Sequence, residues 1–253
     1  MFKKEVILIF WIPLLFFISL KAMTYPIAQD ISYHNFADQR NMLGIDHFLN
    51  VLSNIFFLII GVLGSFKSLQ MEGEYIKYRL VALIFFIGVG LVALGSGYYH
   101  LDPNNMTLVW DRLPMTIAFM AFFSMVVIDR IDARIGQKVV LPISLLLGAL
   151  SILYWVITEN MGVGDLRAYA FIQFFPVILI GLICWMYRQA KIMKVSMLSY
   201  VFLWYAIAKI LEHFDLQFYQ LTFGLVSGHS LKHVAAAIAT WIVYRSIRHV
   251  FPQ

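Results

Sequence analysis

The sequence has little charge and a single cysteine. Only 13% of its 253 residues are charged, whereas 61% are hydrophobic, and the mean hydropathy is +0.80. A soluble domain is about half apolar and about a quarter charged, so this chain has too little polar surface to cover a globule in water. The single cysteine, Cys184, excludes an intramolecular disulfide and a cysteine-based zinc cluster. The solvent of the folded chain must therefore be lipid.

The net charge of +5 does not indicate a nucleic-acid partner, because the basic residues fall in short loops between apolar runs. If the amino terminus is cytoplasmic, most of the 19 Lys and Arg residues lie in loops or at the termini on the inner side of the membrane. This bias is what the positive-inside rule describes. The sequence therefore predicts that both termini are cytoplasmic.

Apolar segments long enough to span a bilayer occur along the whole chain. A membrane-spanning helix needs about 20 mainly apolar residues. Eight segments meet this requirement, at roughly 5–23, 47–66, 79–100, 107–128, 139–157, 168–187, 195–213 and 227–245. The linkers are short, and there is no internal repeat. We therefore expect an all-α fold, a polytopic transmembrane bundle with a seven-helix core and one extra N-terminal helix.

The first apolar segment has the basic start and apolar stretch of a signal peptide. No small-x-small cleavage site follows it, which favours an uncleaved helix. We expect residues 1–24 to form an N-terminal transmembrane helix or signal anchor and residues 25–253 to form the seven-helix domain. Removal of the first segment would leave the orientation of the others unchanged.

Several polar residues lie where hydrocarbon-facing residues are expected. His100 ends an outward-going helix that also carries Ser96, and Asp111 lies near the outer start of the next helix. His229 and His233 lie at the outer start of the last helix. Polar residues at this depth are costly and are a functional-site hypothesis by default. All five residues converge on the outer leaflet, although the last two are far away in sequence.

The spacing of these residues favours a catalytic zinc site. Ser96 and His100 are four residues apart, as are His229 and His233, so each pair shares one helix face. Three histidines would leave one position for water, which is the open geometry of catalytic zinc. The metal would lower the pKa of that water to about 7. Asp111 would take its proton, and Ser96 would donate a hydrogen bond to the developing oxyanion.

Each residue has a simpler interpretation. His100 would then be an interfacial histidine, Asp111 would cap a helix, and Ser96 would allow close helix packing. An HxxxH motif alone is weak evidence for a metal site.

The three motifs together resemble the alkaline ceramidase family, which belongs to the CREST superfamily of membrane hydrolases. They read "SGYYH", "WDRLPM" and "HSLKH", in the order and spacing of the family, and the resemblance covers residues 47–248. It implies a seven-helix bundle with zinc held by His100, His229 and His233. It also implies that Asp111 deprotonates the water and that Ser96 stabilises the oxyanion. The implied reaction is hydrolysis of the ceramide amide, which releases a sphingoid base and a fatty acid.

The chain departs from the family at two points. It has the extra N-terminal helix, and the region where eukaryotic ceramidases bind calcium carries Asp30, Asp38 and Asp46 but no Glu. The missing Glu disfavours a calcium site, and Ca²⁺ is kept only as a second candidate ion. A further polar set, Lys209, Glu212, His213 and Asp215, is interpreted as a salt bridge within the bundle, or alternatively as a support of the zinc site.

The sequence thus predicts a zinc-dependent ceramidase-like amidohydrolase that takes its lipid from the bilayer. Its active site would face the outer leaflet, on the periplasmic, extracellular or luminal side. One alternative is a phospholipid-remodelling acyl hydrolase with the same machinery, and another is a non-catalytic zinc-stabilised receptor. A metal carrier is disfavoured, because the inner halves of the helices are apolar.

Overall fold

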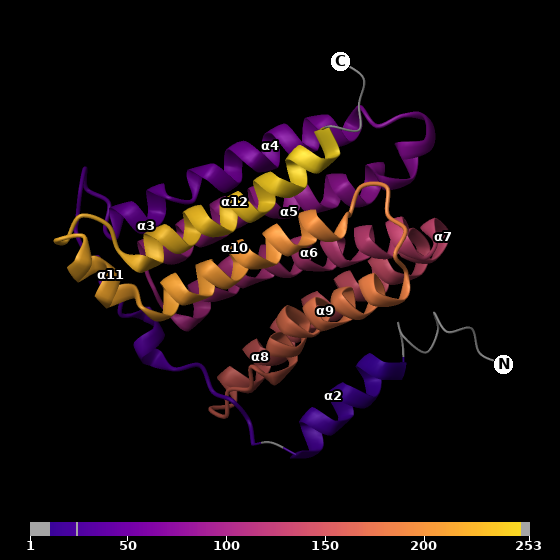
Figure 1. Cartoon of the computed structure of the whole chain (residues 1–253). Coiled ribbons are helices and arrows are strands. Elements are labelled where there is room, and N and C mark those ends of the chain that lie inside the picture. Colours follow the sequence, from indigo (N-terminus) through magenta and orange to yellow (C-terminus); the bar gives the residue numbers. More distant parts are fainter. Residues whose placement is uncertain (1–10, 24, 249–253) are drawn as a thin grey trace.

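The computed structural model describes residues 11–23 and 25–248, and this part of the chain consists of helices and connecting loops (Figure 1). The α-helices are α2 (Ile12–Met23), α3 (Phe48–Leu52), α4 (Ile55–Leu69), α5 (Arg79–Leu101), α6 (Asn105–Arg130), α7 (Ala133–Ile135), α8 (Leu141–Asn160), α9 (Arg167–Met186), α10 (Val195–His213), α11 (Asp215–Leu221) and α12 (Gly228–Arg248). Short helices of other types are η2 (Ile31–His34), η3 (Gly73–Tyr78) and η4 (Gly136–Val140). The expectation of an all-α fold is confirmed.

Six helical stretches of the described chain are long and apolar enough to cross a membrane. They are Phe48–Leu69, Gly73–Leu101, Asn105–Arg130, Ala133–Asn160, Arg167–Met186 and Val195–His213. Helix α12 is also long, but it carries three basic residues and is not among the six. The protein is therefore a multi-pass integral membrane protein.

The N-terminal segment predicted at 5–23 is helical over its described part, α2, whereas residues 5–10 lie outside the described residues. Helix α2 lies at the edge of the bundle against α9, where the rings of Phe17 and Phe171 are 5.4 Å apart (Figure 1). The domain boundary at residue 24 and the cytoplasmic position of the termini remain predictions.

Helix α6 lies at the centre of the bundle. It packs against α5 on one side and against α8 and α9 on the other, and α12 packs against α4 and α10 (Figure 1). In α6, 78% of the most apolar stretch is buried, the largest share among the six. The polar residues Asp111, Arg112 and Thr116 of α6 are themselves buried, so they face other helices rather than lipid.

A capping box at Asn104 sets the start of α6. The Asn104 side chain accepts hydrogen bonds from the backbone N–H groups of Met106 and Thr107, and the Thr107 hydroxyl accepts one from the Asn104 backbone N–H. This arrangement satisfies the free N–H groups of the first turn. Asp111 therefore lies well inside the helix and does not cap it, contrary to the simpler interpretation of that residue.

Gly95 allows α5 and α6 to approach closely beside Ser96 and Asp111. A Cβ atom added at Gly95 would lie 1.9 Å from the backbone oxygen of Trp110. Backbone atoms cannot move aside as the end of a flexible side chain can. The close contact of these two helices at this level therefore requires glycine.

We expect Gly95→Ala to lower the free energy of unfolding by about 1–3 kcal/mol, because α5 and α6 must move apart to accommodate the methyl group. Gly97→Ala is the matched control, since nothing lies within 4 Å of a Cβ added at Gly97. The control should stabilise the helix by up to about 1 kcal/mol. Thermal unfolding in detergent micelles measures both effects. Equal unfolding temperatures for the two variants would contradict the close approach.

Candidate metal centre

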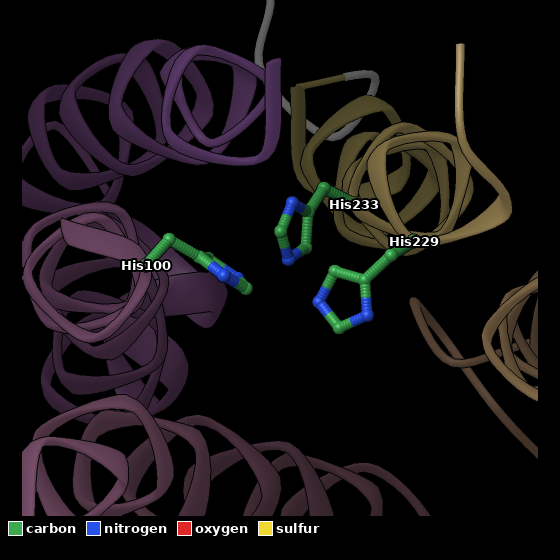
Figure 2. Close-up of side chains that lie close together, drawn as sticks. All are labelled: His100, His229 and His233. Carbon is green, nitrogen blue, oxygen red and sulfur yellow. The ribbon is translucent and has the colours of Figure 1, made fainter. Parts of the chain in front are cut away.

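Three histidine side chains meet at one end of the bundle (Figure 2). His100 comes from the last turn of α5, and His229 and His233 come from the first turns of α12. The ring centroid of His100 lies 4.9 Å from that of His229 and 5.1 Å from that of His233, and the other two centroids are 4.9 Å apart. One nitrogen of each ring lies within 4.8 Å of the others. In the described part of the chain, this is the one cluster of three ligand side chains close enough to hold a metal ion.

The burial and hydrogen bonding of these histidines fit a metal site. All three are buried, and neither ring nitrogen of His100 has a hydrogen-bond partner. A buried polar group without a partner costs about 1–3 kcal/mol, and coordination of a metal would remove that cost for the one nitrogen of His100 that binds it. Imidazole nitrogens suit zinc, copper, iron and nickel ions. The residues present therefore fit a transition-metal ion.

Neighbouring residues fix the orientation of the histidines. The hydroxyl of Ser53 lies 2.7 Å from Nδ1 of His233, which leaves Nε2 of that ring for a metal. The backbone N–H of His229 donates to Asp215 over 2.6 Å. A hydrogen bond on the second ring nitrogen sets the tautomer and direction of a ligand histidine. Ser53 therefore orients the ring of His233, whereas Asp215 holds the backbone of His229 at the start of α12.

Replacement of Ser53 by alanine should weaken metal binding by about 10–100-fold, the usual effect of removing such a supporting hydrogen bond. Ser53→Thr is the matched control because it keeps the hydroxyl. Competition with a chelator of known affinity measures the difference. Unchanged metal affinity in Ser53→Ala would show that the hydrogen bond to His233 does not support the site.

Ser96 and Asp111 lie beside the histidines, at one end of an internal cavity of about 150 Å³. Both residues are buried, and the Ser96 hydroxyl interacts with the Asp111 carboxylate. Lys232 and His233 line the same cavity. Its other walls are mainly apolar and include Phe57, Val89, Phe119, Ile180, Val201 and Val243. All five residues predicted from the sequence therefore lie close together, at the polar end of an otherwise mainly apolar cavity.

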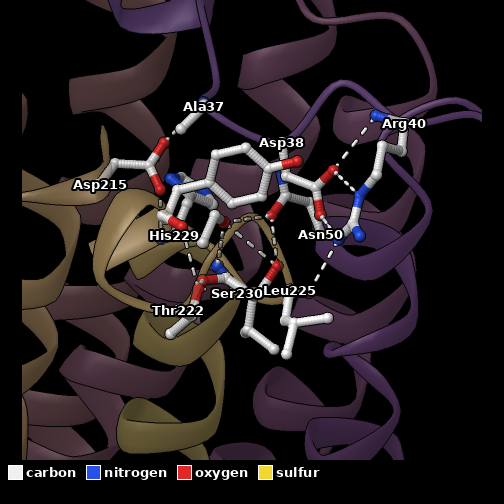
Figure 3. Close-up of polar contacts among 12 residues, drawn as sticks. Ala37, Asp38, Arg40, Asn50, Asp215, Thr222, Leu225, His229 and Ser230 are labelled. Atoms are coloured by element: carbon white, nitrogen blue, oxygen red, sulfur yellow. Dashed lines mark hydrogen bonds and ion pairs between the residues drawn. The ribbon is translucent and has the colours of Figure 1, made fainter. Parts of the chain in front are cut away.

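The segment between α2 and α3 covers the histidines. Phe36, only 4% exposed, packs edge-on against His100 and His229, with ring centroids 4.7 and 4.4 Å apart. Asp215 accepts a hydrogen bond from the backbone N–H of Ala37 over 2.9 Å, in addition to the one from His229 (Figure 3). The same carboxylate therefore holds both the covering segment and a metal-ligand candidate.

The three aspartates considered as calcium ligands have separate partners. Asp30 accepts from the backbone N–H of Ser32, and Asp46 accepts from the Asn41 side chain. Asp38 forms an ion pair with Arg40 at 2.7 Å (Figure 3). Burial raises the pKa of Asp38, but the hydrogen bonds from Arg40 outweigh it and hold that pKa below its ordinary value. These carboxylates do not meet as a ligand group, so the described residues lend the calcium site no support.

The polar set at residues 209–215, at the end of α10 and the start of α11, divides into two roles. Glu212 forms ion pairs with Lys209 and Lys232, both at 2.7 Å, as the salt-bridge interpretation expected. Asp215 instead supports the histidine site, as described above. Ser53, Phe36 and Lys232 were not predicted from the sequence as residues of the site. The position of Lys232 between His229 and His233 was the one available signal.

Two comparisons bear on the family of this chain. Protein-family profiles match residues 44–250 to the family described as Ceramidase. This match covers well over half of the chain and includes all five site residues that were predicted from the sequence. A search of curated proteins finds no match.

Proposed function

The chain belongs to the ceramidase family, and from that premise we propose that it is a metal-dependent hydrolase of ceramide or a closely related N-acyl lipid. The products would be a sphingoid base and a fatty acid. The family implies a hydrolase acting on a lipid amide. The observation that carries the proposal further is the cluster of three buried histidines beside Asp111, at the end of an apolar cavity.

We propose zinc as the metal, held by His100, His229 and His233. Three protein ligands with one open position are typical of catalytic zinc sites. When bound, the ion would supply a water whose pKa is lowered to about 7 and would polarise the amide carbonyl. The two unpartnered nitrogens of His100 support this assignment of the ligands.

Asp111 would act as the general base in this proposal. It would accept a proton from the attacking water and later deliver that proton to the leaving nitrogen, so that the free amine departs. Ser96 would donate a hydrogen bond to the oxyanion that develops on the amide oxygen. The interaction of the Ser96 hydroxyl with the Asp111 carboxylate keeps both groups on the same side of the cavity.

The apolar cavity would hold the acyl chain. Its walls come from α4, α5, α6, α9, α10 and α12, so an acyl chain would lie inside the bundle with its carbonyl at the polar end. The sequence-based orientation would place this end toward the outer leaflet.

Hydrolysis of a lipid panel by purified, detergent-solubilised protein tests the proposal. We expect fatty acid release from ceramide, loss of that release with a strong chelator, and recovery with zinc. Release from phospholipid esters but not from the amide would favour a phospholipid-remodelling hydrolase instead. Zinc binding without turnover of any lipid in the panel would favour the receptor alternative.

A further inference from the structure

A second cavity of about 150 Å³ is lined by Asp111 and Lys232, although by none of the three histidines. We call it the polar arm, because its walls include Tyr33, Arg112 and Glu212. It shares Asp111 and Lys232 with the apolar cavity. The two cavities therefore lie side by side along a shared wall, which also includes Met115, Gln173 and Tyr205, and Asp111 lines both of them.

The charged side chains of the polar arm carry a net positive charge. Arg112, Lys209 and Lys232 supply three cations, whereas Asp111 and Glu212 supply two carboxylates. The balance is +1 when all five groups are ionised. Charges in a space of low polarity interact far more strongly than in water, so this imbalance favours an anionic ligand.

The hydrogen-bonding capacity of Glu212 is already taken up inside the protein. Its carboxylate accepts from Lys209 and Lys232 over 2.7 Å each and from the Tyr33 hydroxyl over 3.0 Å. Burial and the Glu212 carboxylate raise the pKa of Tyr33 well above its ordinary value, so its hydroxyl remains a donor. Glu212 thus holds its cations in place and is poorly available to a ligand.

Arg112 retains an unused donor. Its Nη2 donates to Gln29 over 2.6 Å, but its buried Nη1 has no hydrogen-bond partner. The guanidinium also lies 4.7 Å from the ring centroid of Trp155, 4.8 Å from that of Tyr169 and 5.9 Å from that of Tyr33. These rings fix the cation in position. A fixed, buried cation with a free N–H group is suited to an acceptor brought in by a ligand.

We propose that the polar arm binds an anionic group, a phosphate or carboxylate, on the amine half of the lipid substrate. This inference rests on the proposed hydrolase function, since the arm and the acyl cavity meet at Asp111. The lipid amide would lie beside Asp111, with the acyl chain in the apolar cavity and the anionic group in the polar arm. The net positive charge distinguishes this ligand from a neutral diol, whose hydroxyl groups could accept from Arg112 but would leave the charge uncompensated.

Binding of two short-chain lipids that differ only in a phosphate group tests the proposal. Ceramide and ceramide 1-phosphate form such a pair, and titration of chelator-treated protein separates binding from turnover. We expect the phosphorylated lipid to bind roughly tenfold or more tightly, the effect of one or two charge-assisted hydrogen bonds. Arg112→Gln should reduce this preference at least severalfold, whereas Arg134→Gln, which removes an exposed charge on α7, should not.

A second variant keeps the test informative if Arg112→Gln does not fold. The Lys209 side chain is 38% exposed, so Lys209→Gln should fold and should also weaken the preference. Competition by inorganic phosphate distinguishes two sources of the anion. If phosphate displaces the phosphorylated lipid, the polar arm also binds free phosphate. If phosphate does not displace it, the lipid must carry the anionic group. Both results support an anion site.

Equal affinity for the two lipids, or a preference that persists in both variants, would overturn the anion site. A preference for the phosphorylated lipid without hydrolysis of any lipid would contradict the proposed function and leave the anion site standing. The two failures are therefore distinguishable.

Discussion

His229→Ala is expected to abolish both metal binding and turnover. Loss of a residue that only supports a ligand histidine costs about 10–100-fold, so loss of the ligand itself should cost more than about 100-fold in kcat/KM. Without His229, only His100 and His233 of the cluster remain as ligands. A catalytic zinc site has three protein ligands, so these two should not retain the ion. Elemental analysis should find about one zinc per chain in the wild type and a small fraction of that in His229→Ala and in His100→Ala/His229→Ala.

His213→Ala is the matched control for this experiment. His213 ends α10 at the same end of the bundle but is exposed and lies outside the cluster. This variant should keep its metal and its turnover. Full turnover in His229→Ala with wild-type unfolding behaviour would contradict the metal-dependent mechanism. If the wild-type protein binds the metal but hydrolyses no lipid, the metal site is supported and the proposed hydrolase function is contradicted.

Asp111→Asn is expected to lower kcat by about 10²–10⁴-fold while the metal is retained, because an amide cannot accept the proton from water. The substitution preserves the shape of a side chain that is only 6% exposed, so the packing of α5 on α6 should survive. Hydrolysis rates and metal content measured on the same preparation separate the two effects.

Asp102→Asn makes the same chemical change at an exposed position close by in sequence and should leave the rate unchanged. If Asp111→Asn loses its metal together with its activity, Asp111 supports the site rather than acting as a base. Wild-type turnover in Asp111→Asn would exclude it as the base.

Much of the fold could be predicted from the sequence, because each helix leaves a local signal. The segment expected at 79–100 is observed as α5 over Arg79–Leu101, and that expected at 195–213 is α10 with the same bounds. Long apolar runs between charged loops are sufficient for this, since a bilayer requires every backbone polar group to be paired within the segment. The seventh core helix, α12, could be placed because its polar first turns are followed by an apolar run.

The candidate ligands could also be predicted in part. His229 and His233 are one helical turn apart, so their shared face follows from helix geometry alone. Their meeting with His100 depended on topology, because alternate crossings of the membrane bring the end of one helix and the start of another to the same side. The structure places all three rings together.

The remaining parts of the site follow from contacts that no local pattern records. Phe36 packs on His229 and Asp215 bonds to Ala37 because a loop folds back over the end of the bundle. Ser53 meets His233 across 180 positions of the chain. Nothing in the composition of these segments distinguishes them from other loops.

The sequence by itself determined that this protein is a helical bundle in a membrane and which residues carry the candidate chemistry, because hydropathy and helical spacing act over a few turns. Only the tertiary structure decided that Asp111 lines two adjoining cavities and that Arg112 keeps an unused donor. The physical reason is that burial and hydrogen-bond satisfaction depend on which side chains from distant segments fill the same space.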